Sequence, residues 1–110
     1  MTHIQRSALV ARPAQRLFDL VDDIVAYPDF VPWCEQAEEH ARDEAHVVAS
    51  LCIARAGVRQ RFTTSNARIE PNQINMSLVD GPFKQLEGVW RFDALGDLGC
   101  KVTLTLDFEL

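Results

Sequence analysis

Most of the chain alternates between apolar and polar residues, which is the pattern of a β-sheet with one buried face. In the last such segment, every second residue from Val102 to Leu110 is apolar. Turn-forming groups such as Glu70-Pro71-Asn72 and Asp80-Gly81-Pro82 separate the segments. The pattern predicts an antiparallel sheet with one apolar and one solvated face. The six segments with this period of two are 34–43, 46–56, 58–70, 73–80, 84–94 and 99–110.

The first part of the chain adds one short strand and one amphipathic helix. Residues 3–11 have β-like character, and residues 13–25 carry apolar side chains at helical spacing behind Pro13. Tyr27-Pro28 predicts the end of the helix, because a residue before proline avoids the helical region. The order of elements is that of an α+β domain. One helix is too short to cover a seven-stranded sheet, so further cover must come from another helix, a partner or a ligand.

The segment YPDFVPWC, residues 27–34, concentrates apolar and aromatic side chains where regular structure is unfavourable. Its two prolines exclude a regular helix or a central strand, so we expect at most one irregular helical turn. Three interpretations stay open at this point: a core plug, a docking patch for a partner, or one wall of a ligand site.

Length and composition limit the class of protein. The 110 residues predict a single domain, 1–110, and the net charge of −5 argues against broad attraction to nucleic acid, so we expect no DNA partner. Cys34, Cys52 and Cys100 form no CxxC pair and suggest free thiols in a reducing compartment. The N-terminus lacks the apolar core of a signal peptide, and no apolar run is long enough to span a membrane. We therefore expect a cytoplasmic protein.

Motifs that carry catalytic chemistry are missing from the sequence. It contains no GxSxG, HExxH, GxGxxG or phosphate-binding glycine loop. The histidines and cysteines have no recognisable metal-ligand spacing. The acidic residues between Glu35 and Glu44 are most simply a solvated strand edge and turn. We expect no catalytic residue, no metal site, no cofactor and no enzymatic activity.

Three segments, taken together, resemble those of a known family: YPDFVPWC, FTTSNARIEP and DGPFKQLEGVWRF. The combination resembles the bacterial and mitochondrial coenzyme Q-binding family, which includes the ribosome association toxins called RatA. This family lies within the START-like, polyketide-cyclase-like superfamily, and the resemblance extends over essentially the whole chain. It implies a helix-grip fold, in which a curved antiparallel sheet and N-terminal helices enclose a long C-terminal helix and a lipophilic cavity. No such helix follows Leu110, so we expect a domain truncated at its C-terminal end.

The resemblance implies non-catalytic binding of a hydrophobic molecule, a polyprenyl quinone such as ubiquinone or another isoprenoid. The protein would be a chaperone or carrier that supports respiratory electron transport, with transient contact at the inner membrane. Such a ligand needs a concave apolar surface and only one or two hydrogen bonds. Tyr27, Thr64 and Asn66 are polar residues expected near the cavity, and they form no evident acid–base pair.

The candidate cavity lining combines the aromatic segment with inward-facing strand positions. For each residue, ordinary core packing is the alternative explanation. Leu51 and Ile53 are ambiguous, because both faces of 46–56 contain apolar residues. The candidates are Phe30, Val31, Trp33, Leu51, Ile53, Phe62, Met76, Leu78, Phe83, Leu86, Trp90 and Phe92.

Two alternative functions follow from the same resemblance. One is a toxin that binds the large ribosomal subunit and blocks the association of subunits, with Arg55, Arg59 and Arg61 as ribosome-facing residues. These arginines can equally belong to a solvated hairpin. The other is an aromatase or polyketide cyclase, as in relatives within the superfamily, although no acid–base pair supports it.

Overall fold

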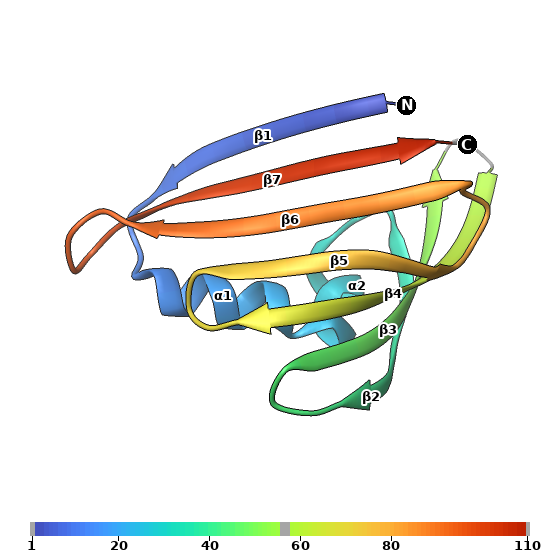
Figure 1. Ribbon diagram of the computed structural model, residues 1–110, viewed down its shortest axis with the longest axis horizontal. Coiled ribbons are helices and arrows are strands. Elements are labelled where there is room, and N and C mark those ends of the chain that lie inside the picture. Colours follow the sequence, from blue (N-terminus) through green and yellow to red (C-terminus); the bar gives the residue numbers. More distant parts are fainter. Residues whose placement is uncertain (1, 56–57, 110) are drawn as a thin grey trace.

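The computed structural model describes residues 2–55 and 58–109. A strand, three short helical segments and six further strands follow one another along the chain (Figure 1). The elements are β1 (Thr2–Val10), α1 (Ala14–Asp22), η1 (Ile24–Ala26), α2 (Tyr27–Phe30), β2 (Cys34–Arg42), β3 (His46–Arg55), β4 (Val58–Ile69), β5 (Gln73–Asp80), β6 (Gln85–Ala94) and β7 (Cys100–Glu109).

All seven predicted strands are confirmed over the described residues, with ends close to those expected. Positions 56 and 110, where two of the predicted strands end, lie outside the described residues. The predicted helix over 13–25 is wrong at its C-terminal end, because α1 stops at Asp22. Asp23 leaves the helical region, with φ −85° and ψ 72°, and its N–H bonds to the carbonyl oxygen of Asp19. Arg42 and Arg68 pair with the Asp22 carboxylate at this end, which offsets its unfavourable position at the negative end of the helix dipole. The irregular turn expected in 27–34 is present as α2.

The seven strands form one antiparallel sheet in the order β1-β7-β6-β5-β4-β3-β2. Figure 1 shows the sheet curving strongly at β2 and β3, with α1 and α2 on one side of it. Thr2 pairs with Phe108, so the start of β1 lies beside the end of β7. This arrangement is the α+β architecture, with a curved antiparallel sheet, that the sequence predicts.

Two hydrophobic clusters hold the helical segments against the sheet. In the first, Phe18 of α1 is fully buried and packs edge-on against Phe92, with 5.8 Å between the ring centroids. In the second, Ile24 of η1 packs against Val47 and Ala49 of β3. The clusters identify the inner face of the sheet, which is the face that α1 and η1 cover. In the described part of the chain, no helix has both the length and the apolar character needed to span a membrane.

Candidate functional site

The strand register places most of the expected lining residues on the inner face. Leu51 pairs with Phe62, and Met76 pairs with Gly88, so apolar side chains of neighbouring strands stand side by side. The ambiguity of β3 is resolved, because Val47 and Ala49 lie under η1. Every second residue after them, Leu51 and Ile53, faces the same way. The expected residues on this face are Leu51, Ile53, Phe62, Met76, Leu78, Leu86, Trp90 and Phe92.

Three phenylalanines form a continuous aromatic wall at one end of this face. Phe83 lies edge-on to both Phe62 and Phe108, with ring centroids 5.8 and 6.0 Å apart. Gly81 makes the contact feasible, because a Cβ at that position would lie 2.7 Å from the Cβ of Phe62. The sequence motif that contains Gly81 and Phe83 therefore has a packing role. Phe108 belongs to the same wall, although it was not among the expected lining residues.

Trp90 and Phe92 contribute differently to the inner face. Their rings stack nearly parallel, with centroids 6.3 Å apart. Phe92 has no exposed surface, since Phe18 covers it, whereas Trp90 is only partly buried. Phe92 therefore supports the face from within the core, and Trp90 keeps part of its surface accessible.

Phe30 at the end of α2 and Trp33 in the connection to β2 keep much of their surface exposed. Phe30 and Trp33 are 50% and 45% exposed, and Phe30 packs edge-on against Tyr27 at 5.8 Å. The carbonyl oxygen of Trp33 accepts a hydrogen bond from the backbone N–H of Ala54, which fixes the connection to β3. Val31, in the connection, is half-buried. All three residues, which directly precede β2, are thus at least partly exposed.

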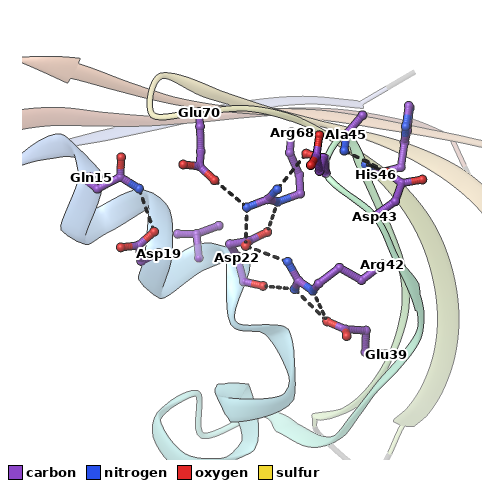
Figure 2. Close-up of polar contacts among 12 residues, drawn as sticks. Gln15, Asp19, Asp22, Glu39, Arg42, Asp43, Ala45, His46, Arg68 and Glu70 are labelled. Atoms are coloured by element: carbon purple, nitrogen blue, oxygen red, sulfur yellow. Dashed lines mark hydrogen bonds and ion pairs between the residues drawn. The ribbon is translucent and has the colours of Figure 1, made fainter.

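Asp22, the last residue of α1, is bound by two arginines from distant strands (Figure 2). Arg68 donates from Nε and Nη2 to the two carboxylate oxygens at 2.9 and 3.0 Å. Arg42 donates to Oδ2 at 2.9 Å and to the Asp22 carbonyl oxygen at 3.0 Å. Hydrogen bonding to Asp22 raises the pKa of Arg68 above its usual value. The network attaches the end of α1 to β2 and β4, and local sequence patterns contain no signal for it.

Tyr27 is anchored beside this network. Its hydroxyl donates to the carbonyl oxygen of Val21, near the end of α1. Burial, and then the negative charge of Asp22, raise the pKa of the phenol. The phenol is a hydrogen-bond donor committed to the backbone, so it positions α2 and is not free for acid–base chemistry.

The expected ribosome-facing arginines lie on the outer face and pair with glutamates of β2. Arg59 contacts Glu35 at 2.8 Å, and Arg61 contacts Glu38 at 3.0 Å, and all four side chains are substantially exposed. The hydrogen bond from Arg61 lowers the pKa of Glu38. The Arg55 side chain lies outside the described residues. Each described guanidinium is thus partly neutralised, and the hairpin is a mixed-charge surface.

A separate hollow of about 350 Å³ lies at the β2 edge, and both polar and apolar side chains line it. Ser50 lines it and shares hydrogen bonds with His40 and Thr63, at 2.6 and 2.5 Å. Ser50 is only 1% exposed, so its hydroxyl is closed to a substrate and is not a suitable nucleophile. The lining residues are Pro28, Gln36, Ala37, Glu38, Ser50, Cys52 and Arg61.

Comparison with known proteins gives a consistent result. The model of the family described as polyketide cyclase / dehydrase and lipid transport matches residues 10–110. The ribosome association toxin RatA of Pseudomonas aeruginosa is 48% identical over 108 residues, which are 98% of this chain and 75% of that protein. The mitochondrial coenzyme Q-binding protein COQ10 homolog B of Xenopus laevis is 33% identical over 95 residues, covering 86% of this chain and 38% of that protein.

Solved structures with the same fold include proteins of diverse description. A Thermus thermophilus protein aligns with a TM-score of 0.91 at 24% identity, over 99% of this chain and 75% of the other. The Zhui aromatase/cyclase from a Streptomyces species aligns with a TM-score of 0.89 at 24% identity, over 97% of this chain and 67% of the other. These likenesses show the START-like fold alone. The family model and the sequence relatives establish that the chain belongs to the polyketide cyclase / dehydrase and lipid transport family.

Proposed function

We propose that the chain acts as a ribosome association toxin, binding the large ribosomal subunit and blocking its association with the small one. The observation that carries this proposal is the 48% identity to a protein of that name over 98% of the chain. Relatives of the same name in Vibrio cholerae and Escherichia coli, at 47% and 38% identity, add support. The sequence alone favoured quinone binding, so the similarities reverse the order of the two hypotheses.

The outer β3–β4 hairpin is our candidate for the ribosome contact. Arg59 and Arg61 project from it, and their partners Glu35 and Glu38 are surface residues whose ion pairs exchange readily with solvent. Contact with RNA phosphates would replace these weak pairs with stronger charge-assisted bonds. Replacing an arginine by glutamate away from this hairpin, at the exposed Arg91 of β6, provides a matched control.

Co-sedimentation with purified large subunits tests this contact. Wild-type protein should pellet with the subunit, and the double variant Arg59→Glu/Arg61→Glu should pellet less. The control Arg91→Glu should behave as the wild type. Equal pelleting of the double variant and the wild type would exclude the hairpin as the contact surface, while failure of the wild type to pellet would count against the function itself.

A specific observation also favours a second function, the binding of a lipophilic molecule on the inner face. The wall of Phe62, Phe83 and Phe108, with Met76 and Trp90 beside it, offers partly exposed apolar and aromatic surface. Aromatic and methionine side chains give such a surface large contact area and adaptable shape. A relative named as a coenzyme Q-binding protein makes a polyprenyl quinone the natural candidate ligand.

Extraction of the purified protein with organic solvent, followed by mass spectrometry, tests ligand binding. A co-purifying quinone or other isoprenoid, reduced in amount by Trp90→Leu, would support this function. The control variant Val79→Ala changes an apolar residue that is 58% exposed, and it should retain the ligand. Preparations that consistently lack any isoprenoid would contradict the proposal.

Catalysis forms no part of the proposal. The polar residues on the inner face of β4 are Gln60, Thr64, Asn66 and Arg68. Arg68 is committed to Asp22, and neither a hydroxyl nor an amide side chain supplies a general acid or base near neutral pH. The solved aromatase/cyclase shares the fold with this chain, at an identity that carries no inference about chemistry.

A further inference from the structure

The inner face of β4 differs from its neighbours because its side chains are polar. Thr64, Asn66 and Arg68 follow one another there, between apolar rows on β3 and β5. Arg68 is bound to Asp22, but Thr64 and Asn66 lie further along the strand and are 8% and 7% exposed. Two nearly buried polar side chains thus stand between the apolar rows of β3 and β5.

Their mutual hydrogen bond uses only part of the Asn66 amide. The Thr64 hydroxyl donates to Oδ1 of Asn66 at 2.8 Å, which leaves the two N–H donors of Nδ2. Within residues 2–55 and 58–109, no fully buried side-chain nitrogen or oxygen lacks a partner, and no hydrogen bond there uses Nδ2. Nδ2 is therefore not fully enclosed by protein, although Asn66 as a whole is only 7% exposed. A donor in apolar surroundings is unfavourable until it meets an acceptor.

The surroundings of Asn66 are suited to an apolar molecule with a polar group. Asn66 stands between Val47 of β3 and Met76 of β5. Val47 belongs to the cluster under η1, and Met76 packs against the cluster under α1. The amide thus lies where the two hydrophobic clusters meet, so a ligand lying along the sheet would pass over it.

We propose that Asn66 determines ligand specificity by donating a hydrogen bond from Nδ2 to a carbonyl oxygen of an apolar ligand. Thr64 is a positioning residue, because its bond to Oδ1 turns the N–H groups away from the strand and toward the ligand. This inference rests on the proposed binding of a lipophilic molecule. The preferred class is a ketone or quinone with an alkyl or isoprenoid tail, since a carbonyl accepts a hydrogen bond, whereas a hydrocarbon leaves both N–H groups without a partner.

Two probes with the same tail separate the carbonyl contact from apolar burial: 2-decyl-1,4-benzoquinone and decylbenzene. Their affinities are measured by displacement of the neutral apolar dye N-phenyl-1-naphthylamine. The wild type should bind the quinone about 5- to 10-fold more tightly than decylbenzene, as expected for one net hydrogen bond. This comparison requires no variant and so does not depend on the folding of one.

The double variant Thr64→Val/Asn66→Leu replaces both polar partners by apolar groups of similar shape, which proteins tolerate better than the loss of one partner. It should bind the two probes about equally, with decylbenzene bound as well as by the wild type. Asn75→Leu is the matched control, because Asn75 lies on the same sheet with the opposite orientation and accepts a hydrogen bond from Gln73. The control should keep the preference for the quinone.

The possible results distinguish this inference from the function on which it rests. Equal affinity of the wild type for both probes, or an undiminished quinone preference in the double variant, would overturn the role of Asn66 and leave lipophilic binding intact. If neither probe displaces the dye from the wild type, both the inference and the lipophilic function are wrong.

Discussion

The Asp22 carboxylate and the Arg68 guanidinium form a bidentate ion pair across 46 residues of sequence, with N–O distances of 2.9 and 3.0 Å. Their side chains are only 14% and 12% exposed. The Arg68 guanidinium also lies over the ring of Phe18, 5.4 Å from its centroid. One strand thus holds both the last turn of α1 and the aromatic residue at the centre of the first cluster.

Loss of one partner of this pair should destabilise the protein strongly. Asp22→Asn leaves two arginines without their shared carboxylate, and the free energy of unfolding should fall by about 3 kcal/mol. Chemical denaturation measures this change. The double variant Asp22→Asn/Arg68→Met should lose less than the sum of the single variants, because the pair is coupled.

The exposed pair of Arg59 and Glu35 is the control for this prediction. Its side chains are 70% and 41% exposed, so solvent already screens their interaction. Arg59→Met should leave the denaturation midpoint unchanged within error. The central role of the Asp22 pair would be contradicted if the losses in unfolding free energy of the Asp22 and Arg68 variants were additive. It would also be contradicted if Arg59→Met lowered the unfolding free energy as much as Asp22→Asn.

The Asp22 network also explains where prediction from sequence fails. Periodicity extends the first helix to residue 25, but α1 ends at Asp22, which is drawn to arginines on β2 and β4. Those contacts join residues 20 and 46 positions apart, so no local window contains them. The strands were predictable because alternation is a local property that a half-buried sheet imposes on each strand separately.

The candidate site was predictable to the same extent. Clean alternation placed Met76, Leu78 and Trp90 on one face, and the register agrees. In β3 both faces contain apolar residues, so only the pairing with β4 reveals the orientation of Leu51 and Ile53. The open N–H groups of Asn66 could not be predicted, since they depend on a hydrogen bond between two side chains of one strand.

Tyr27 should stay protonated at a pH where an ordinary tyrosine ionises. Its pKa lies above the usual 10.0, mainly because the phenol is buried and also because Asp22 is close. A raised pKa means that the folded state holds the proton more tightly than the unfolded state. The resulting stability is complete below pH 10.0 and is lost as the pH rises through the folded-state pKa.

Absorbance at alkaline pH can follow this group directly, because Tyr27 is the only tyrosine in the sequence. The native protein should show phenolate absorbance at higher pH than the urea-unfolded chain, and Tyr27→Phe should remove the signal. Coincident titration curves for the folded and unfolded protein would show that the phenol is not buried as described.

Gly81 should tolerate substitution less well than Gly96. Gly81 has φ +155°, and an added Cβ would lie 2.7 Å from the Cβ of Phe62, so Gly81→Ala should cost about 1–3 kcal/mol of stability. At Gly96, φ is +72° but no atom lies within 4 Å of the added Cβ, so Gly96→Ala adds only backbone strain. Thermal denaturation should rank Gly81→Ala as the less stable variant. The reverse order would mean that the Phe62–Phe83 contact does not depend on Gly81.

The three cysteines should react with iodoacetamide in a defined order. Burial raises the pKa of the Cys34 and Cys100 thiols, so each carries less of the reactive thiolate at neutral pH. Cys52 is only half-buried and belongs to the outer face of β3. Peptide mass spectrometry should find Cys52 modified first, with equal rates after unfolding. Faster modification of Cys100 in the folded protein would contradict its placement in the core.

Sucrose-gradient profiles of ribosomes test the central functional claim most directly. Purified protein is added to whole ribosomes under conditions in which the two subunits associate and dissociate reversibly, with heat-denatured protein as the control. We expect free subunits to increase at the expense of whole ribosomes, in proportion to the protein added. An unchanged ratio of free subunits to whole ribosomes, at protein concentrations above that of the ribosomes, would contradict the proposed function.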